Sequence, residues 1–214
     1  MGNTTWAANY SFNPTVPAGF TVEYYNNNPT INGAITYQNL VFSGTGTAGA
    51  SAALSIQGNL TNTGGGLLDF GANNVNISGN VATHDIAGFT TLGTVSMNKT
   101  GGTATFTSAV AGGNLTIGVA GGTLNLGTGL IHTFTGTWTR TNGTLNGGSS
   151  RLRIGGNVSG STGTFTANTG TVEWNGGAQI LAGVTYNNLT LSGTGTKTTT
   201  GVTVNGILSM EGDA

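Results

Sequence analysis

One twelve-residue segment of the chain occurs twice. TYQNLVFSGTGT occupies residues 36–47 and TYNNLTLSGTGT occupies residues 185–196, so nine of twelve positions match at a separation of 149 residues. The similarity continues upstream, because TVEYYNNNPTINGAI at 21–35 aligns with TVEWNGGAQILAGV at 171–184 with one residue of slip. Self-similarity of this kind indicates a chain built from repeated units.

A shorter motif, Gly-Asn-(Leu/Val), indicates the length of the unit. It begins at Gly58, Gly79, Gly113 and Gly156, with spacings of 21, 34 and 43 residues. The first spacing is one unit and the last is close to two, so the long repeat holds about seven units of roughly 21 residues. A unit this short, with two or three short strands between Gly and Asn turns, is typical of one coil of a β-solenoid.

Apolar and polar residues alternate in short runs along the chain. In NLTIGV, for example, Leu115 and Ile117 share one face and Asn114 and Thr116 share the other. No stretch keeps a helical apolar pattern for more than two turns. We therefore predict an all-β fold, a β-solenoid with coils of about 21 residues and more than half of its residues in strands. Tandem β-sandwiches are the alternative architecture. The predicted core contains Leu40, Phe42, Leu54, Ile56, Leu115, Ile117, Leu152, Ile154, Leu189 and Leu191.

The composition fits stacked coils. Only 5% of residues are charged and 40 are glycine, whereas about 25% of an average domain is charged. Identical positions of successive coils lie one above the other, and a column of like charges would be unfavourable. Thr and Asn avoid that repulsion, and Gly and Asn tolerate tight corners. The net charge of −1 and the absence of Cys argue against nucleic-acid binding, disulfides and thiolate metal sites.

The first twenty residues differ from the rest. WAANYSFNPTVPAGF holds two of the three prolines, so residues 1–20 are predicted to cap a coil or dock into a neighbouring molecule. Trp6, Tyr10 and Phe12 are the candidate subunit contacts. Residues 21–214 form the predicted β-repeat domain, which we expect to continue beyond 214 in a longer protein. No apolar run is long enough for a transmembrane helix, and a signal sequence is absent from this numbering.

The strings TGTVEWNG, TYNNLTLSGTGTKTTTGVTVNGILSM and GNLTNTGG resemble the very large secreted bacterial proteins built from β-strand repeats. These include autotransporter-like and filamentous-haemagglutinin-like adhesins. The resemblance covers residues 21–214 loosely and 171–210 best. It implies an extracellular or cell-surface location and a role in adhesion, matrix or fibre building.

No cluster of catalytic or metal-binding residues stands out. The six acidic residues are scattered, and Glu23 and Glu173 fall about seven coils apart, so they are expected to be solvated singly. His84 and Asp85 are neighbours, but adjacent strand residues point to opposite faces. Asp69 follows a Gly-rich run without the repeated Gly-Gly-x-Gly-x-Asp pattern of calcium-binding solenoids. We predict no catalytic residue, no cofactor and no metal.

Trp138 and Arg140 are the weak candidates for a glycan contact. An exposed Trp beside Arg could stack on a sugar ring, but we favour the alternative that Trp138 fills the core while Arg140 leaves it at the strand end. The chain as a whole suggests a structural, non-enzymatic extracellular repeat protein whose copies assemble end to end into a filament or matrix. An adhesin stalk that binds glycans or a cell surface is the alternative, and an enzyme on a β-helix fits least.

Overall fold

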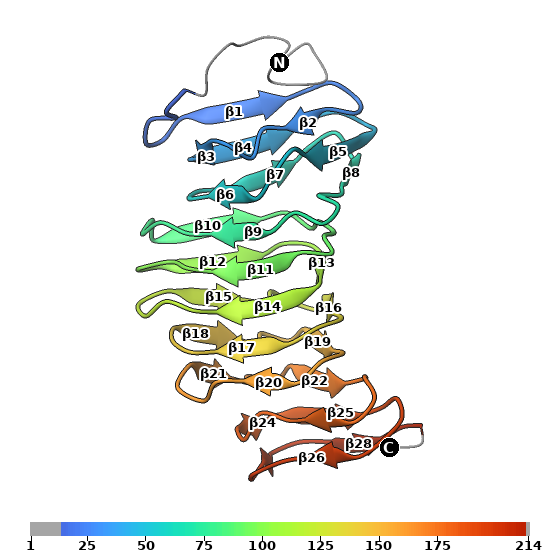
Figure 1. The fold of residues 1–214 in the computed structure, drawn as a ribbon. Coiled ribbons are helices and arrows are strands. Elements are labelled where there is room, and N and C mark those ends of the chain that lie inside the picture. Colours follow the sequence, from blue (N-terminus) through green and yellow to red (C-terminus); the bar gives the residue numbers. More distant parts are fainter. Residues whose placement is uncertain (1–13, 213–214) are drawn as a thin grey trace.

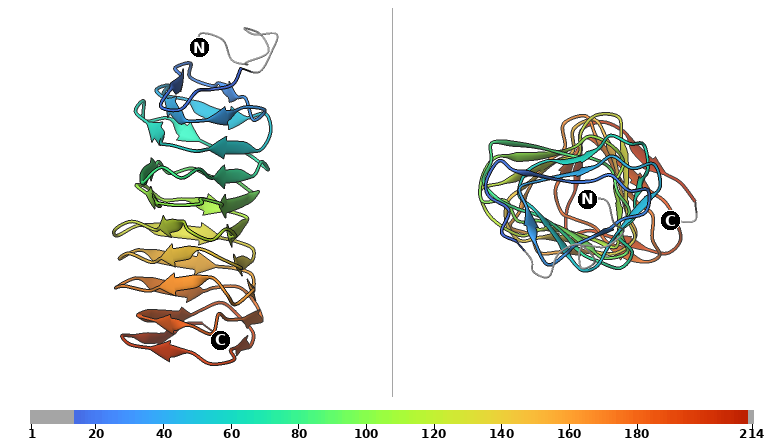
Figure 2. Two further views of the ribbon diagram at one scale, coloured as in Figure 1. Left: turned by 90° about the vertical axis from the view of Figure 1, so that its left-hand side faces the viewer. Right: turned by 90° about the horizontal axis from the view of Figure 1, so that it is seen from above.

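The computed structural model describes residues 14–212. These residues form a rod of stacked coils, seen from the side in Figure 1 and along its axis in Figure 2. The 28 strands are two to four residues long, all of their pairings are parallel, and the described residues include no helix and hence none that could span a membrane. The β-solenoid prediction is confirmed, and the tandem sandwiches are not what the chain forms.

The parallel strands are arranged on three faces of the rod. Face 1 contains β1 (Thr21–Tyr24), β4 (Asn39–Phe42), β7 (Leu60–Asn62), β10 (Thr83–Ile86), β12 (Thr103–Phe106), β15 (Thr123–Asn125), β18 (Thr144–Asn146) and β21 (Thr164–Thr166). Face 2 contains β3 (Thr36–Tyr37), β6 (Leu54–Ile56), β9 (Val75–Ile77), β11 (Thr94–Met97), β14 (Asn114–Ile117), β17 (Trp138–Arg140) and β20 (Val158–Ser159).

Face 3 runs the full length of the rod. It begins with β2 (Thr30–Ile31), β5 (Thr47–Ala50) and β8 (Leu67–Leu68), and it ends with β13 (Ala111–Gly112), β16 (Ile131–Phe134), β19 (Arg151–Ile154), β22 (Thr171–Trp174), β25 (Asn188–Leu191) and β28 (Leu208–Met210). Thr90 joins the two parts through single bridges to Asp69 and Ala111. Face 3 therefore contains one strand or bridge residue from each of about ten successive coils.

Two further pairs complete the last coils. β23 (Gln179–Ile180) pairs with β26 (Lys197–Thr198), and β24 (Thr185–Tyr186) pairs with β27 (Thr203–Val204). β23 lies next to β20, because the Ile180 amide donates to Asn157 Oδ1 at 2.9 Å. β24 lies beside β21, because the Tyr186 and Phe165 rings are 6.0 Å apart between centroids. These strands therefore continue faces 2 and 1.

The core is a set of apolar columns. Each coil places its inward residue below that of the coil before it, as where Val75, Val95 and Leu115 stand in register on face 2. Nine of the ten predicted core residues are buried, and Leu191 is half-buried because the coil below it is itself uncovered. The prediction that more than half of the residues lie in strands is wrong. Strands this short leave most of each coil to turns and corners.

The long repeat is offset around the rod. Its first copy places β1 on face 1, β2 on face 3 and β3 on face 2, whereas its second copy places β22 on face 3, β23 beside face 2 and β24 beside face 1. Seven coils separate β1 from β21, and β22 lies one face further on. The 149 residues therefore make seven coils and one third, and the coils are closer to 20 residues than to 21.

Both copies of the repeat make the same contacts on their different faces. Tyr37 Oη donates to the Asn32 carbonyl at 2.8 Å, and its counterpart Tyr186 donates to the Ala182 carbonyl at 2.7 Å. Both tyrosines are fully buried. On the outer surface, Ser43 donates to Glu23 and Ser192 donates to Glu173. The repeat therefore encodes a corner with fixed inner and outer contacts, whichever face it occupies.

The Gly-Asn-(Leu/Val) motif connects successive coils. Asn59, Asn114 and Asn157 each accept a backbone N–H from the next coil, at 2.8–2.9 Å. The preceding glycine is needed because the coils approach closely there. A Cβ on Gly58 would lie 1.9 Å from the Gln38 carbonyl oxygen, and one on Gly113 would lie 2.2 Å from that of Leu92.

The second copy of the motif, Gly79-Asn80-Val81, supplies a matched control. Asn80 is exposed, and its side chain makes no hydrogen bond to another described residue, unlike that of Asn157. Asn157→Ala should lower the free energy of unfolding by about 1 kcal/mol through the lost hydrogen bond, and Asn80→Ala should change it by less than about 0.5 kcal/mol. Urea unfolding of the two variants measures the difference. Equal losses would show that the asparagine bond contributes nothing.

Candidate functional site

The sequence-based candidates for a glycan contact lie inside the rod. Trp138 has no exposed surface, and its ring packs 6.2 Å from Trp174 and 5.4 Å from Phe165 between centroids. Its ring is therefore unable to stack on a sugar at the surface, which agrees with the alternative that Trp138 fills the core. Trp6, Tyr10 and Phe12 lie outside the described residues.

Arg140 does not leave the core as that alternative expected. It is buried, its Nη2 donates to the Gly163 carbonyl at 2.6 Å, and its guanidinium carbon lies 5.5 Å from the centre of the Trp138 ring. The inward position on β17 directs the side chain to the interior, where the Trp138 ring and the Gly163 carbonyl stabilise its charge while the buried Nε has no hydrogen-bond partner among the described residues. Burial lowers the Arg140 pKa, and the charge of Tyr186 partly opposes this.

Glu173 is buried, whereas the sequence suggested a solvated carboxylate. Arg153 binds it through Nε at 3.0 Å and Nη2 at 3.1 Å, Arg151 lies 3.4 Å away, and Ser192 donates at 2.8 Å. Burial alone would raise its pKa, but these hydrogen bonds and charges outweigh burial and hold the pKa below its usual range. Glu23 is exposed, as expected. The Glu173 cluster stabilises the outer side of face 3.

His84 and Lys99 meet in the interior. His84 points inward from β10 while Asp85 points outward, as alternation predicts. The Lys99 side chain is fully buried, and its Nζ lies 3.0 Å from the Val81 carbonyl oxygen and 3.2 Å from His84 Nε2. Burial lowers the pKa of Lys99. Burial, and then the charge of Lys99, lower the pKa of His84 to about 4.

The second histidine is structural. His132 Nδ1 accepts the Val110 N–H at 3.1 Å, and its Nε2 donates to the Leu126 carbonyl at 2.8 Å. Both ring nitrogens are therefore used, and the neutral ring carries its proton on Nε2. Across residues 14–212, no three His, Asp or Glu side chains lie close enough to hold a metal ion.

The surface feature that distinguishes one part of the rod is a groove at the corner between faces 1 and 3. Successive coils turn this corner with different numbers of residues. Eight residues separate Leu60 from Asp69, but only three separate their register partners Ile86 and Thr90. The corner is therefore drawn inward at the coil that contains β10.

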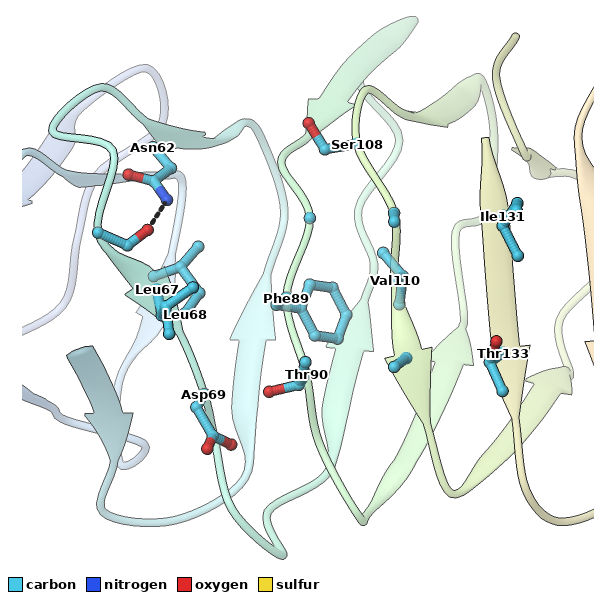
Figure 3. Close-up of a pocket in the computed structure, with 14 residues that line it drawn as sticks. Asn62, Leu67, Leu68, Asp69, Phe89, Thr90, Ser108, Val110, Ile131 and Thr133 are labelled. Carbon is cyan, nitrogen blue, oxygen red and sulfur yellow. Dashed lines mark hydrogen bonds between the residues drawn. The ribbon is translucent and has the colours of Figure 1, made fainter. Parts of the chain in front are cut away.

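The following coil also has a short corner. Four residues separate Phe106 from Ala111, the register partners of Ile86 and Thr90. The corner of the next coil is longer again. Seven residues separate Asn125 from Thr133, whereas five separate their register partners Thr105 and Ala111. Two short corners thus lie between longer ones and leave a hollow of about 400 Å³, which we call the corner groove (Figure 3).

The corner groove combines an apolar floor with polar edges. Leu67 and Ile131, which are 67% and 53% exposed, stand on opposite walls (Figure 3), and Phe89 and Val110, which are 3% and 1% exposed, lie beneath the floor. Asn62, Asp69, Thr90, Ser108 and Thr133 supply amide, carboxylate and hydroxyl groups.

The groove continues beyond these walls. An adjoining hollow of about 430 Å³ shares Asn62, Gly88 and Ser108 with it and extends to Asn59 and Asp85 on face 1. A second, of about 330 Å³, shares Thr90 and Ala111 and extends to Leu92 and Thr135 on face 3. The three hollows follow the strand direction around the rod.

Backbone pairing is interrupted along one wall of the groove. The Ala87 N–H donates to the Leu60 carbonyl at 2.8 Å, and the next backbone bond between these two coils is that from Thr90 to Leu68 at 2.9 Å. Asn62 lies between them. Its Nδ2 donates to the Gly66 carbonyl at 2.6 Å (Figure 3), while its buried Oδ1 accepts no hydrogen bond from a described residue.

Comparisons with models of protein families, with curated proteins and with solved structures find no match to this chain.

The buried histidine predicts a loss of stability in acid. The pKa of His84 is about 4 in the folded chain and about 6.5 when unfolded, so its contribution is complete above pH 6.5 and is lost as the pH falls towards 4. The slope is about 1.4 kcal/mol per pH unit, or about 3 kcal/mol over this window.

Urea unfolding at intervals from pH 7 to 4.5 measures this loss. His84→Gln, which keeps an acceptor for Lys99 but does not titrate, should lose about 3 kcal/mol less than the wild type by the acid end of the window. The burial-lowered pKa of His132 acts in the same direction in both proteins and cancels in the comparison. Parallel pH profiles would contradict the prediction.

Proposed function

We propose that this chain is a structural, non-enzymatic repeat protein, a segment or subunit of a self-assembling filament or matrix at a bacterial cell surface or outside the cell. The observation that carries the proposal is the continuous in-register stacking of parallel coils, which runs through to the coil that contains β28. Leu208 and Met210 stand in register below Leu189 and Leu191, yet they are 54% and 67% exposed. This coil presents core side chains to whatever lies beyond it.

The same coil presents a backbone edge. β28 pairs with β25 on one side, and no described strand pairs with its other side. An open edge of parallel strands with apolar side chains recruits further strands. A following coil of a longer chain or a coil of a second molecule would satisfy the same groups, and we propose that copies of this chain meet there end to end.

The charge distribution supports stacking and a non-catalytic role. With 11 Lys, Arg, Asp and Glu residues in all, little repulsion opposes the approach of two ends. Arg140, Arg153, Glu173 and Lys99 are bound to neighbouring groups of the fold. Such groups stabilise coils and do not converge on a common reaction centre.

End-to-end assembly predicts sensitivity to charge at the exposed coil. The double variant Leu208→Asp with Met210→Asp should remove filaments seen by negative-stain microscopy and reduce the mass measured by sedimentation velocity, because burial of carboxylates at the junction is costly. Leu67→Asp, an equally exposed leucine on the side of the rod, is the control and should assemble normally.

Deletion of residues 1–20 tests the other end of the proposed junction. If Trp6, Tyr10 and Phe12 contact the neighbouring subunit, the deletion should weaken assembly as strongly as the double variant. A wild-type chain that stays monomeric at high concentration would contradict the filament proposal and leave the binding module as the better description.

The second candidate function, an adhesin stalk or binding module, is favoured by one observation. The corner groove hollows the side of the rod over two successive coils. Stacking alone gives no reason for such a hollow, so a ligand that binds along the side of the rod would account for it.

A further inference from the structure

The corner groove has the dimensions of a site for an extended polymer. Successive coils lie about 4.8 Å apart, so two shortened corners open a channel about 10 Å wide between its walls. The channel follows the strand direction through three adjoining hollows, from Asp85 on face 1 to Leu92 on face 3. Its central volume of about 400 Å³ is within the range of sites for small ligands.

The charges of the groove limit the chemistry of the ligand. Asp69 and Asp85 are the charged side chains among the residues that line the three hollows, and no Lys, Arg or His lines them. Both carboxylates are on exposed residues. An anionic ligand would be repelled, whereas a ligand rich in hydroxyl groups could donate hydrogen bonds to the carboxylates.

The remaining lining groups match a ligand with two kinds of surface. Leu67 and Ile131 offer exposed apolar contact on the walls, while the buried Phe89 and Val110 lie beneath the floor. Along the edges, the Ser108 and Thr133 hydroxyls can donate and accept, and Asn62 Oδ1, which is unpaired among the described residues, can accept. Sugar rings combine apolar C–H faces with hydroxyl edges, so a glycan chain matches this alternation.

The interrupted ladder adds backbone groups to the site. The Leu60 and Leu68 carbonyls each accept a backbone N–H from the coil that contains Phe89. No other backbone hydrogen bond joins these two coils between those two bonds, among the described residues. The N–H groups of Gly88 and Phe89, which line the groove, donate to no described residue. Buried or half-buried amides of this kind require a partner, and ligand hydroxyl groups can supply it.

We propose that the corner groove binds a neutral, linear oligosaccharide, which lies along the strand direction between Leu67 and Ile131 with its hydroxyl groups on Asp69, Asp85 and the Gly88–Phe89 amides. This inference rests on the second candidate function and names its ligand class. It does not depend on end-to-end assembly.

The test is a titration followed by backbone amide NMR. Cellopentaose, maltopentaose and laminaripentaose are the neutral probes, and hexagalacturonate is the anionic control. At least one neutral probe should shift the amide signals of Gly88, Phe89 and Ser108, and hexagalacturonate should shift none of them. The absence of any shift with all three neutral probes, or equal binding of hexagalacturonate, overturns the proposal.

Variants locate the site without disturbing the core. Ser108 is exposed at the groove and Ser161 is exposed in another turn, so Ser108→Trp fills the groove and Ser161→Trp is its matched control. Ser108→Trp should raise the Kd at least tenfold, and Ser161→Trp should leave it within twofold. A Kd unchanged by Ser108→Trp places binding elsewhere and overturns the assignment.

A peptide of residues 5–13 provides the competing outcome. If this peptide binds with a Kd that rises tenfold in Ser108→Trp, the groove is a docking site for a protein segment and the glycan proposal fails. Sedimentation velocity on the same samples reports assembly separately. Loss of glycan binding with intact filaments, or the reverse, therefore distinguishes failure of this inference from failure of the structural proposal.

Discussion

The parallel backbone ladder between residues about 20 positions apart is the interaction on which the whole molecule depends. Each coil is too short to enclose a core, so its inward side chains are buried only when the ladder places another coil above and below. The ladder also fixes the register, as where Thr103 to Phe106 follow Thr83 to Ile86 residue for residue. Columns of like residues, the asparagine bonds at corners and the glycines at close approaches all follow from that register.

The ladder restricts which polar groups the interior can hold. An inward position is surrounded by backbone that is already paired, so a polar side chain there must find a group at a corner. Lys99 reaches the Val81 carbonyl in a turn, and His132 bridges the Val110 amide and the Leu126 carbonyl. Side chains that stay charged are rare in the interior. Arg140 is held there by the Gly163 carbonyl and the Trp138 ring. The low charge content of the chain is a consequence of this packing.

The sequence was sufficient to predict the coil, but not its exceptions. Repeats and alternation predict strands, inward residues such as Leu115 and Leu152, and a solenoid, because these depend on local pattern. The offset of one third of a coil between the two copies of the long repeat was not predictable, because it depends on the summed lengths of all the coils between them. The core position favoured for Trp138 is confirmed, and a surface position was kept as the weaker candidate because alternation fixes two faces without saying which one is inside. Neither spacing nor composition revealed that Glu173 is covered by Arg151 and Arg153 from the neighbouring coil.

The corner groove could not be predicted for a related reason. The shortened segments 87–89 and 107–110 are unremarkable as sequence, and they become a hollow only when register places them between the longer corners at 61–68 and 126–132. Corner length can change at one coil without altering the inward columns of its neighbours, because His84 and Ala104 keep their register beside the groove. A solenoid can therefore acquire a binding surface at its corners while the ladder that holds the rod together stays intact. The ends of the rod and its corners are independent surfaces, and assembly and ligand binding can evolve on them separately.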